Sequence, residues 1–77
     1  MAIDNHGREV VHLDREKVVS LLLKRNITFT DLARTADVST ATIHNGFKGT
    51  IYRDTAIKIA RALGVAAIEI IAGGDGQ

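Results

Sequence analysis

The chain contains no cysteine, no proline and no tryptophan, and its aromatic residues are two phenylalanines and one tyrosine. Without cysteine it cannot form disulfide bonds or thiolate metal sites, which fits a reducing cytoplasm. No apolar run approaches the roughly 18 residues needed to span a bilayer. The first ten residues, MAIDNHGREV, lack the basic and then apolar succession of a secretory signal. We therefore expect a cytoplasmic protein with no membrane partner.

The 77 residues are 45% hydrophobic and 25% charged, which is typical of one small globular domain. The net charge is only +1, but the charges are unevenly distributed. The segment from Lys17 to Arg53 has six basic and two acidic residues, a net +4, and the remainder carries −3. This asymmetry is compatible with a basic face, although scattered solubilising charge would also explain it.

Most of the chain has the pattern of short helices separated by polar breaks. The apolar spacings predict five helices, at about residues 15–25, 29–36, 40–47, 53–63 and 66–72. The first three are expected to begin after the capping residues Asp14, Thr28 and Ser39. Asn26 is expected to break the first helix and Gly64 to stop the fourth, and Gly49 is expected to form a left-handed cap after the third.

The ends of the chain are less regular. Residues 1–12 are predicted to form an N-terminal arm, largely disordered, in which Arg8–Leu13 could instead pair as a strand with another chain. Residues 13–72 would form the domain, and residues 73–77 a flexible tail. In the last helix we expect Ile68 and Ile71 to face the core and Ile70 to be left exposed.

Residues 28–47 read as two short helices joined by a tight turn, which is a helix-turn-helix. The second of these helices has one apolar anchor in its centre, Ile43, and mostly small or polar residues around it. A helix that enters the major groove of DNA needs such an outward side, because its neighbours there are bases and phosphates.

The segments TFTDLARTADVSTATIHNGFKG and AIKIARALGV resemble the Cro/repressor-type (XRE-like) helix-turn-helix domain. The resemblance extends from about Val18 to Ile71. It implies an all-α, compact, five-helix lambda-repressor-like DNA-binding domain, with a possible N-terminal arm or short strand. It also implies a homodimer on a double-stranded DNA operator and association with the nucleoid. The dimer contact could come from the last helix or from strand pairing by Arg8–Leu13.

The resemblance implies DNA contacts at ten positions. Those that match base-reading positions are Thr40, Ala41 and Asn45. Those that match contacts to base or sugar-phosphate are Thr42 and His44. Those that match phosphate or backbone contacts are Thr28, Ser39, Lys48, Thr50 and Arg53. We expect Tyr52 to pack on the fourth helix with its hydroxyl exposed.

Three residues depart from the family pattern. Phe29 replaces a glutamine that often touches phosphate, Gly46 replaces a large apolar residue, and Phe47 replaces a residue that is often acidic. The family's acid pairs in some members with an arginine, and the matching residue here is Leu22. We expect Phe47 to pack on Leu22 while Gly46 makes room for its ring.

The hypothesis is therefore a sequence-specific DNA-binding regulator, either a repressor of a phage, plasmid or other mobile element, or a small bacterial regulator. Alternatives are the antitoxin of a toxin–antitoxin pair, and a helix-turn-helix module that binds protein without DNA. No arrangement of residues suggests catalysis, a cofactor or a small-molecule ligand. The histidines His6, His12 and His44 have no metal-ligand spacing, so no metal site is expected.

Overall fold

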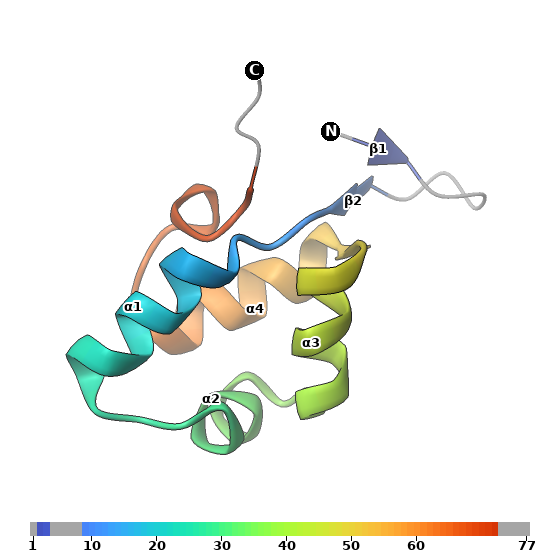
Figure 1. Ribbon diagram of the computed structural model, residues 1–77. Coiled ribbons are helices and arrows are strands. Elements are labelled where there is room, and N and C mark those ends of the chain that lie inside the picture. The colour runs from blue at the N-terminus through green and yellow to red at the C-terminus, as the bar shows by residue number, and fades with distance from the viewer. Residues whose placement is uncertain (1, 4–8, 73–77) are drawn as a thin grey trace.

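The computed structural model describes residues 2, 3 and 9–72. Four α-helices dominate this part of the chain (Figure 1). They are α1 (Arg15–Arg25), α2 (Phe29–Ala36), α3 (Thr40–Lys48) and α4 (Arg53–Leu63). The remaining elements are the strands β1 (Ala2–Ile3), β2 (Glu9–Val11) and β3 (Ile51–Tyr52), and the 3-10 turn η1 (Ala67–Glu69).

The helix starts are the ones that the capping residues predict. The Asp14 side chain accepts a hydrogen bond from the Lys17 N–H, and the Ser39 hydroxyl accepts one from the Thr42 N–H. Thr28 and Asp31 form a reciprocal capping box, with both bonds at 3.1 Å. These bonds satisfy N–H groups that have no partner inside their own helix.

The helix ends also follow local chemistry, with one exception. Asn26, Asp37 and Gly64 adopt left-handed backbone conformations directly after α1, α2 and α4. The predictions for Asn26 and Gly64 are therefore confirmed. The prediction for Gly49 is wrong, because its φ is −145° and not left-handed. The end of α3 is held instead by a distant segment, as described below.

Of the two expectations for the N-terminal segment, a disordered arm or a short strand, residues 9–11 form the strand, but they pair within the chain. β2 lies between β1 and β3 in an antiparallel sheet, with Val10 opposite Ala2 on one side and Tyr52 on the other. Val10 and Val11 are buried. Because both neighbours of β2 come from the same chain, Glu9–Val11 has no free edge for the strand pairing with a second copy that the sequence left open. The expected tail, residues 73–77, lies outside the described residues.

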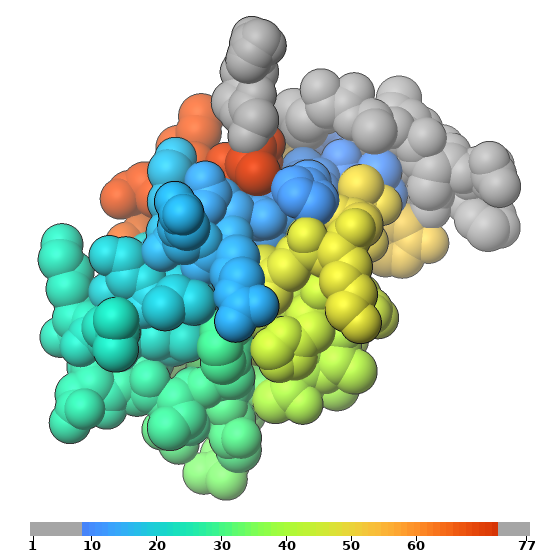
Figure 2. Space-filling view, in the orientation of Figure 1, coloured from blue at the N-terminus to red at the C-terminus, as the bar shows by residue number. Residues whose placement is uncertain are grey.

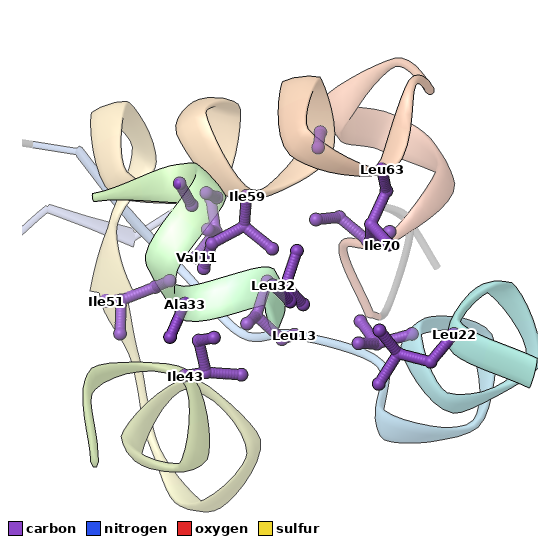
Figure 3. Close-up of a cluster of buried hydrophobic side chains, with 14 residues drawn as sticks. Val11, Leu13, Leu22, Leu32, Ala33, Ile43, Ile51, Ile59, Leu63 and Ile70 are labelled. Carbon is purple, nitrogen blue, oxygen red and sulfur yellow. The ribbon is translucent and has the colours of Figure 1, made fainter. Parts of the chain in front are cut away.

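The core is a single apolar cluster to which every helix contributes (Figure 3). α2 packs on α4 and α3 packs on α2, so the core lies behind the two helices of the helix-turn-helix. The side chains with the least exposure, at 0 to 1%, are Leu13, Val18, Leu32, Ile43, Ala56, Ile59, Ala60, Leu63 and Ile70. Burial of one valine, leucine or isoleucine side chain stabilises the fold by roughly 1.5–3 kcal/mol relative to leaving it exposed.

The predicted fifth helix is a single 3-10 turn, and its inward side chain is not the expected one. Ile68 is 74% exposed, whereas Ile70 is completely buried. The chain leaves η1 after one turn because the Asp14 N–H bonds to the Ile70 carbonyl at 2.8 Å and Leu13 forms a β-bridge with Ile71. This pairing turns Ile70 inward, which a continued α-helix would not have done.

Candidate nucleic-acid interface

The turn between α2 and α3 is short and well bonded. Asp37 is left-handed, with φ 61°, and the Val38 N–H donates to the Ala33 carbonyl at 3.0 Å. Val38 is half-buried against the core, and Ser39 then starts α3. These contacts fix the angle between the two helices, which is the defining geometry of a helix-turn-helix.

α3 is anchored from behind by Ile43 and Gly46, both buried. Ile43 points into the core beside Ala33 and Leu13 (Figure 3). A Cβ atom built on Gly46 would lie 2.7 Å from Leu13 Cδ1 and 3.3 Å from Ile51 Cδ1. Gly46 therefore makes room for Leu13. Phe47 is half-buried against the core, and its packing on Leu22 stays a prediction.

The opposite side of α3 carries the residues expected to read bases. Ala41, Asn45 and Lys48 follow at spacings of four and three, which places them along one line of the helix. All three are exposed, as is Thr40 in the first turn. In the space-filling view α3 (yellow-green) forms the surface beside α2 (Figure 2). The structure thus brings these four side chains together on one accessible surface.

Beside that line, α3 borders an open hollow of about 360 Å³. Thr42 and Asn45 line it from α3, and Thr50, Tyr52 and Thr55 line it from the segment that follows. Its hydroxyl and amide groups are the kinds that donate to phosphate oxygens. Thr55 was not identified from the sequence, where it is one of many threonines without a motif.

On the other side of the line lies an aromatic cluster. The His44 ring centroid is 5.1 Å from that of Phe29 and 5.8 Å from that of Phe47, and the two phenylalanine rings are 5.9 Å apart. The Arg15 guanidinium carbon lies 5.9 Å from the Phe47 centroid. The two phenylalanines that depart from the family pattern thus pack against one DNA-contact candidate, His44, and bring the start of α2 next to α3.

The residues expected near phosphate surround α3. Thr28 and Ser39 are exposed at the starts of α2 and α3. Lys48 is exposed in the last turn of α3, and Thr50 is exposed just beyond it. Both cap hydroxyls are already acceptors within the chain, and Ser39 Oγ also lies 2.9 Å from Thr42 Oγ1. Each can still use its remaining hydrogen-bonding capacity toward a ligand.

Arg53 has a carboxylate neighbour among the described residues. Its Nη1 atom lies 3.5 Å from Glu9 Oε1, in a half-exposed ion pair between α4 and β2. Exposed pairs of this kind contribute little to stability, with a median of about 0–1 kcal/mol.

The capping box also sets the charge state at the start of α2. The hydrogen bond from the Thr28 backbone N–H holds the pKa of Asp31 below its usual value, and the Thr28 side chain adds to the effect. A charged carboxylate in this first turn suits the positive end of the helix dipole.

Among residues 9–72, histidine and acidic side chains do not form a group of three that could hold a metal ion. None of the helices in the described part of the chain is long and apolar enough to cross a bilayer.

Comparison with known proteins agrees with this geometry. The family model for the Cro/C1-type HTH DNA-binding domain matches residues 17–72. No curated protein and no solved structure is significantly similar to the chain. The match covers most of α1, the whole helix-turn-helix, α4 and η1. The chain therefore belongs to the family of Cro/C1-type helix-turn-helix DNA-binding domains.

Proposed function

We propose that this protein is a sequence-specific regulator that inserts α3 into the major groove of double-stranded DNA and represses transcription by blocking access to its operator. The observation that supports this proposal best is the two-sidedness of α3. Ile43 is fully buried behind it, while Thr40, Ala41 and Asn45 are exposed in front. A helix with small and polar outward residues fits a groove about 12 Å wide.

Within this proposal, Asn45 is the main base-reading residue. Its amide can donate to and accept from one adenine, a paired contact that discriminates against other bases by about 1–3 kcal/mol. Thr40 and Ala41 can contact thymine methyl groups. Thr42 and His44, on either side of this line, contact base edges or the sugar-phosphate backbone.

The backbone contacts would come from Thr28, Ser39, Lys48, Thr50 and Arg53. Lys48 contributes an exposed ammonium group at the end of α3. Arg53 would have to share its guanidinium between Glu9 and a phosphate. Such contacts orient the protein and supply most of its salt dependence.

We further propose that two copies bind together, with their α3 helices in successive major grooves about 34 Å apart. Of the dimer contacts considered from the sequence, the one that remains open is the surface around Ile68, since Ile70 is buried and β2 is paired within the chain. Ile68→Asp should lower the dimer fraction in sedimentation equilibrium and weaken operator binding without lowering thermal stability.

The decisive experiment is selection from a pool of random duplex DNA, followed by titration of the recovered site at several salt concentrations. A regulator should enrich a two-fold symmetric site and lose affinity steeply as salt rises. If no sequence is enriched and binding to any duplex is negligible, the protein-interaction alternative replaces this proposal. An operator adjoining a gene for a co-expressed toxin, together with a stable complex of the two proteins, would favour the antitoxin alternative.

A further inference from the structure

The segment that connects β2 to α1 holds the C-terminal end of α3. The Leu13 N–H donates to the Gly46 carbonyl at 2.9 Å, and the His12 ring bonds through Nδ1 to the Gly49 carbonyl at 2.5 Å. Carbonyl groups in the last turn of a helix have no partner within the helix. Two backbone carbonyls at this end, that of Gly46 in α3 and that of Gly49 directly after it, thus receive donors from residues more than 30 positions earlier in the sequence.

Gly49 stands between two residues proposed to contact the DNA backbone. Lys48 precedes it and Thr50 follows it, and both are exposed. The Gly49 N–H is bonded to the Asn45 carbonyl at 2.8 Å, and its carbonyl is bonded to His12. The peptide groups on both sides of Gly49 are therefore fixed, one by α3 itself and the other by His12.

We propose that His12 is a positioning residue for DNA binding, which holds the 48–50 turn in the orientation that presents Lys48 and Thr50 to the phosphates. This inference rests on the proposed function. The family pattern gives His12 no role, because the match begins at residue 17. His12 itself is exposed, so its hydrogen bond rather than its burial is the basis of the effect.

The chemistry of the bond defines which side chains could replace His12. A carbonyl oxygen only accepts, so Nδ1 must carry the proton. This bond forms both in the neutral ring protonated at Nδ1 and in the imidazolium, so positioning does not require a charge. An asparagine amide nitrogen occupies nearly the same place as Nδ1, whereas leucine offers similar bulk with no donor.

The test compares wild type, His12→Asn, His12→Leu and His12→Ala by titration with the selected duplex at several salt concentrations. His12→Leu and His12→Ala should weaken binding by about 3- to 10-fold, the effect of one lost hydrogen bond. Both variants should also reduce the slope of log affinity against log salt, by at most about one, which corresponds to the loss of one phosphate contact. His12→Asn should restore most of the affinity and the slope.

A second readout separates positioning from general stability. In amide NMR spectra of the free protein, the signals of Gly49 and Thr50 should shift in His12→Leu and return toward their wild-type places in His12→Asn. Equal affinity and equal slope in all four proteins would overturn the inference while leaving the proposed function intact. Failure of the wild type to bind any duplex would instead overturn the proposed function, and this inference with it.

Discussion

Gly46 in α3 lies directly against Leu13, so that a Cβ atom on the glycine would meet Leu13 Cγ at 2.9 Å and Cδ1 at 2.7 Å. Leu13 is 1% exposed, so the core surrounds its side chain. The close approach lets the Leu13 N–H reach the Gly46 carbonyl. The glycine at position 46 of α3 is therefore required by its packing against the segment that precedes α1.

Gly46→Ala tests this relationship. Alanine would gain about 1 kcal/mol of helix propensity, but overpacking a filled core costs typically about 1–3 kcal/mol. Because Leu13 and Ile51 both confine the new methyl group, we expect the overpacking cost to exceed the gain. Urea denaturation should show a lower free energy of unfolding. Ala41→Gly, at an exposed position of the same helix, calibrates the propensity contribution, and a stabilised Gly46→Ala would contradict the proposed packing.

Asn45→Ala should relax the base preference at one position of each half-site. It should leave the fold unchanged, because the Asn45 side chain is exposed. The loss of discrimination should be about 1–3 kcal/mol at that base pair. Repeating the selection with the variant measures it directly, with Ser20→Ala on the exposed side of α1 as the control. An unaltered site preference would remove Asn45 from the base-reading set.

Lys48→Ala should weaken binding evenly across sequences and reduce the slope of log affinity against log salt by about one. The reason is that its ammonium group lies at the exposed end of α3, where it would neutralise one phosphate. Lys24→Ala, at the end of α1, removes the same charge far from α3 and should keep the wild-type slope (Figure 1). Identical slopes in the two variants would argue against a phosphate contact.

Asp31→Asn should destabilise the protein at neutral pH and much less in acid. The pKa of Asp31 is lowered in the folded state, chiefly by the Thr28 backbone N–H. Its stabilising effect is therefore present above the unfolded-state pKa, about 4, and is lost as the pH falls through the lower folded-state value. Thermal unfolding between pH 7 and pH 2 should show a gap between wild type and variant that closes in acid. Thr35→Ala, which changes no charge in α2, should show no such closure.

The local features of this fold are readable from the sequence, because their partners lie within a few residues. Asp14, Thr28 and Ser39 each bond an N–H three residues ahead, and Ile43 is the one large apolar side chain in the middle of α3. The positions of these helix starts and of the inward anchor were therefore correct.

The features that sequence reasoning missed depend on distant partners. Leu13 forms a β-bridge with Ile71, and this pairing ends η1 after one turn. As a result Ile70 is buried in the core, and Ile68, which was expected there, is exposed. His12 bonds to Gly49, which replaces the left-handed cap that a glycine after a helix suggests. Neither pairing leaves a periodic signal, because each joins segments more than 30 residues apart. The exposed positions on α3 followed from helical geometry once the inward residue was known, and their contacts with DNA stay a prediction.

The bridge between Leu13 and Ile71 joins the beginning and the end of residues 9–72. The His12 carbonyl accepts the Ala72 N–H at 2.7 Å, and the Asp14 N–H reaches the Ile70 carbonyl. Residues 12–14 and 70–72 thus hold each other in place near the two ends of the described segment 9–72. The buried, hydrogen-bonded amides of the helices, those of α3 included, should therefore exchange with deuterated solvent more slowly than amides at exposed helix ends, and chiefly when the domain opens as a whole.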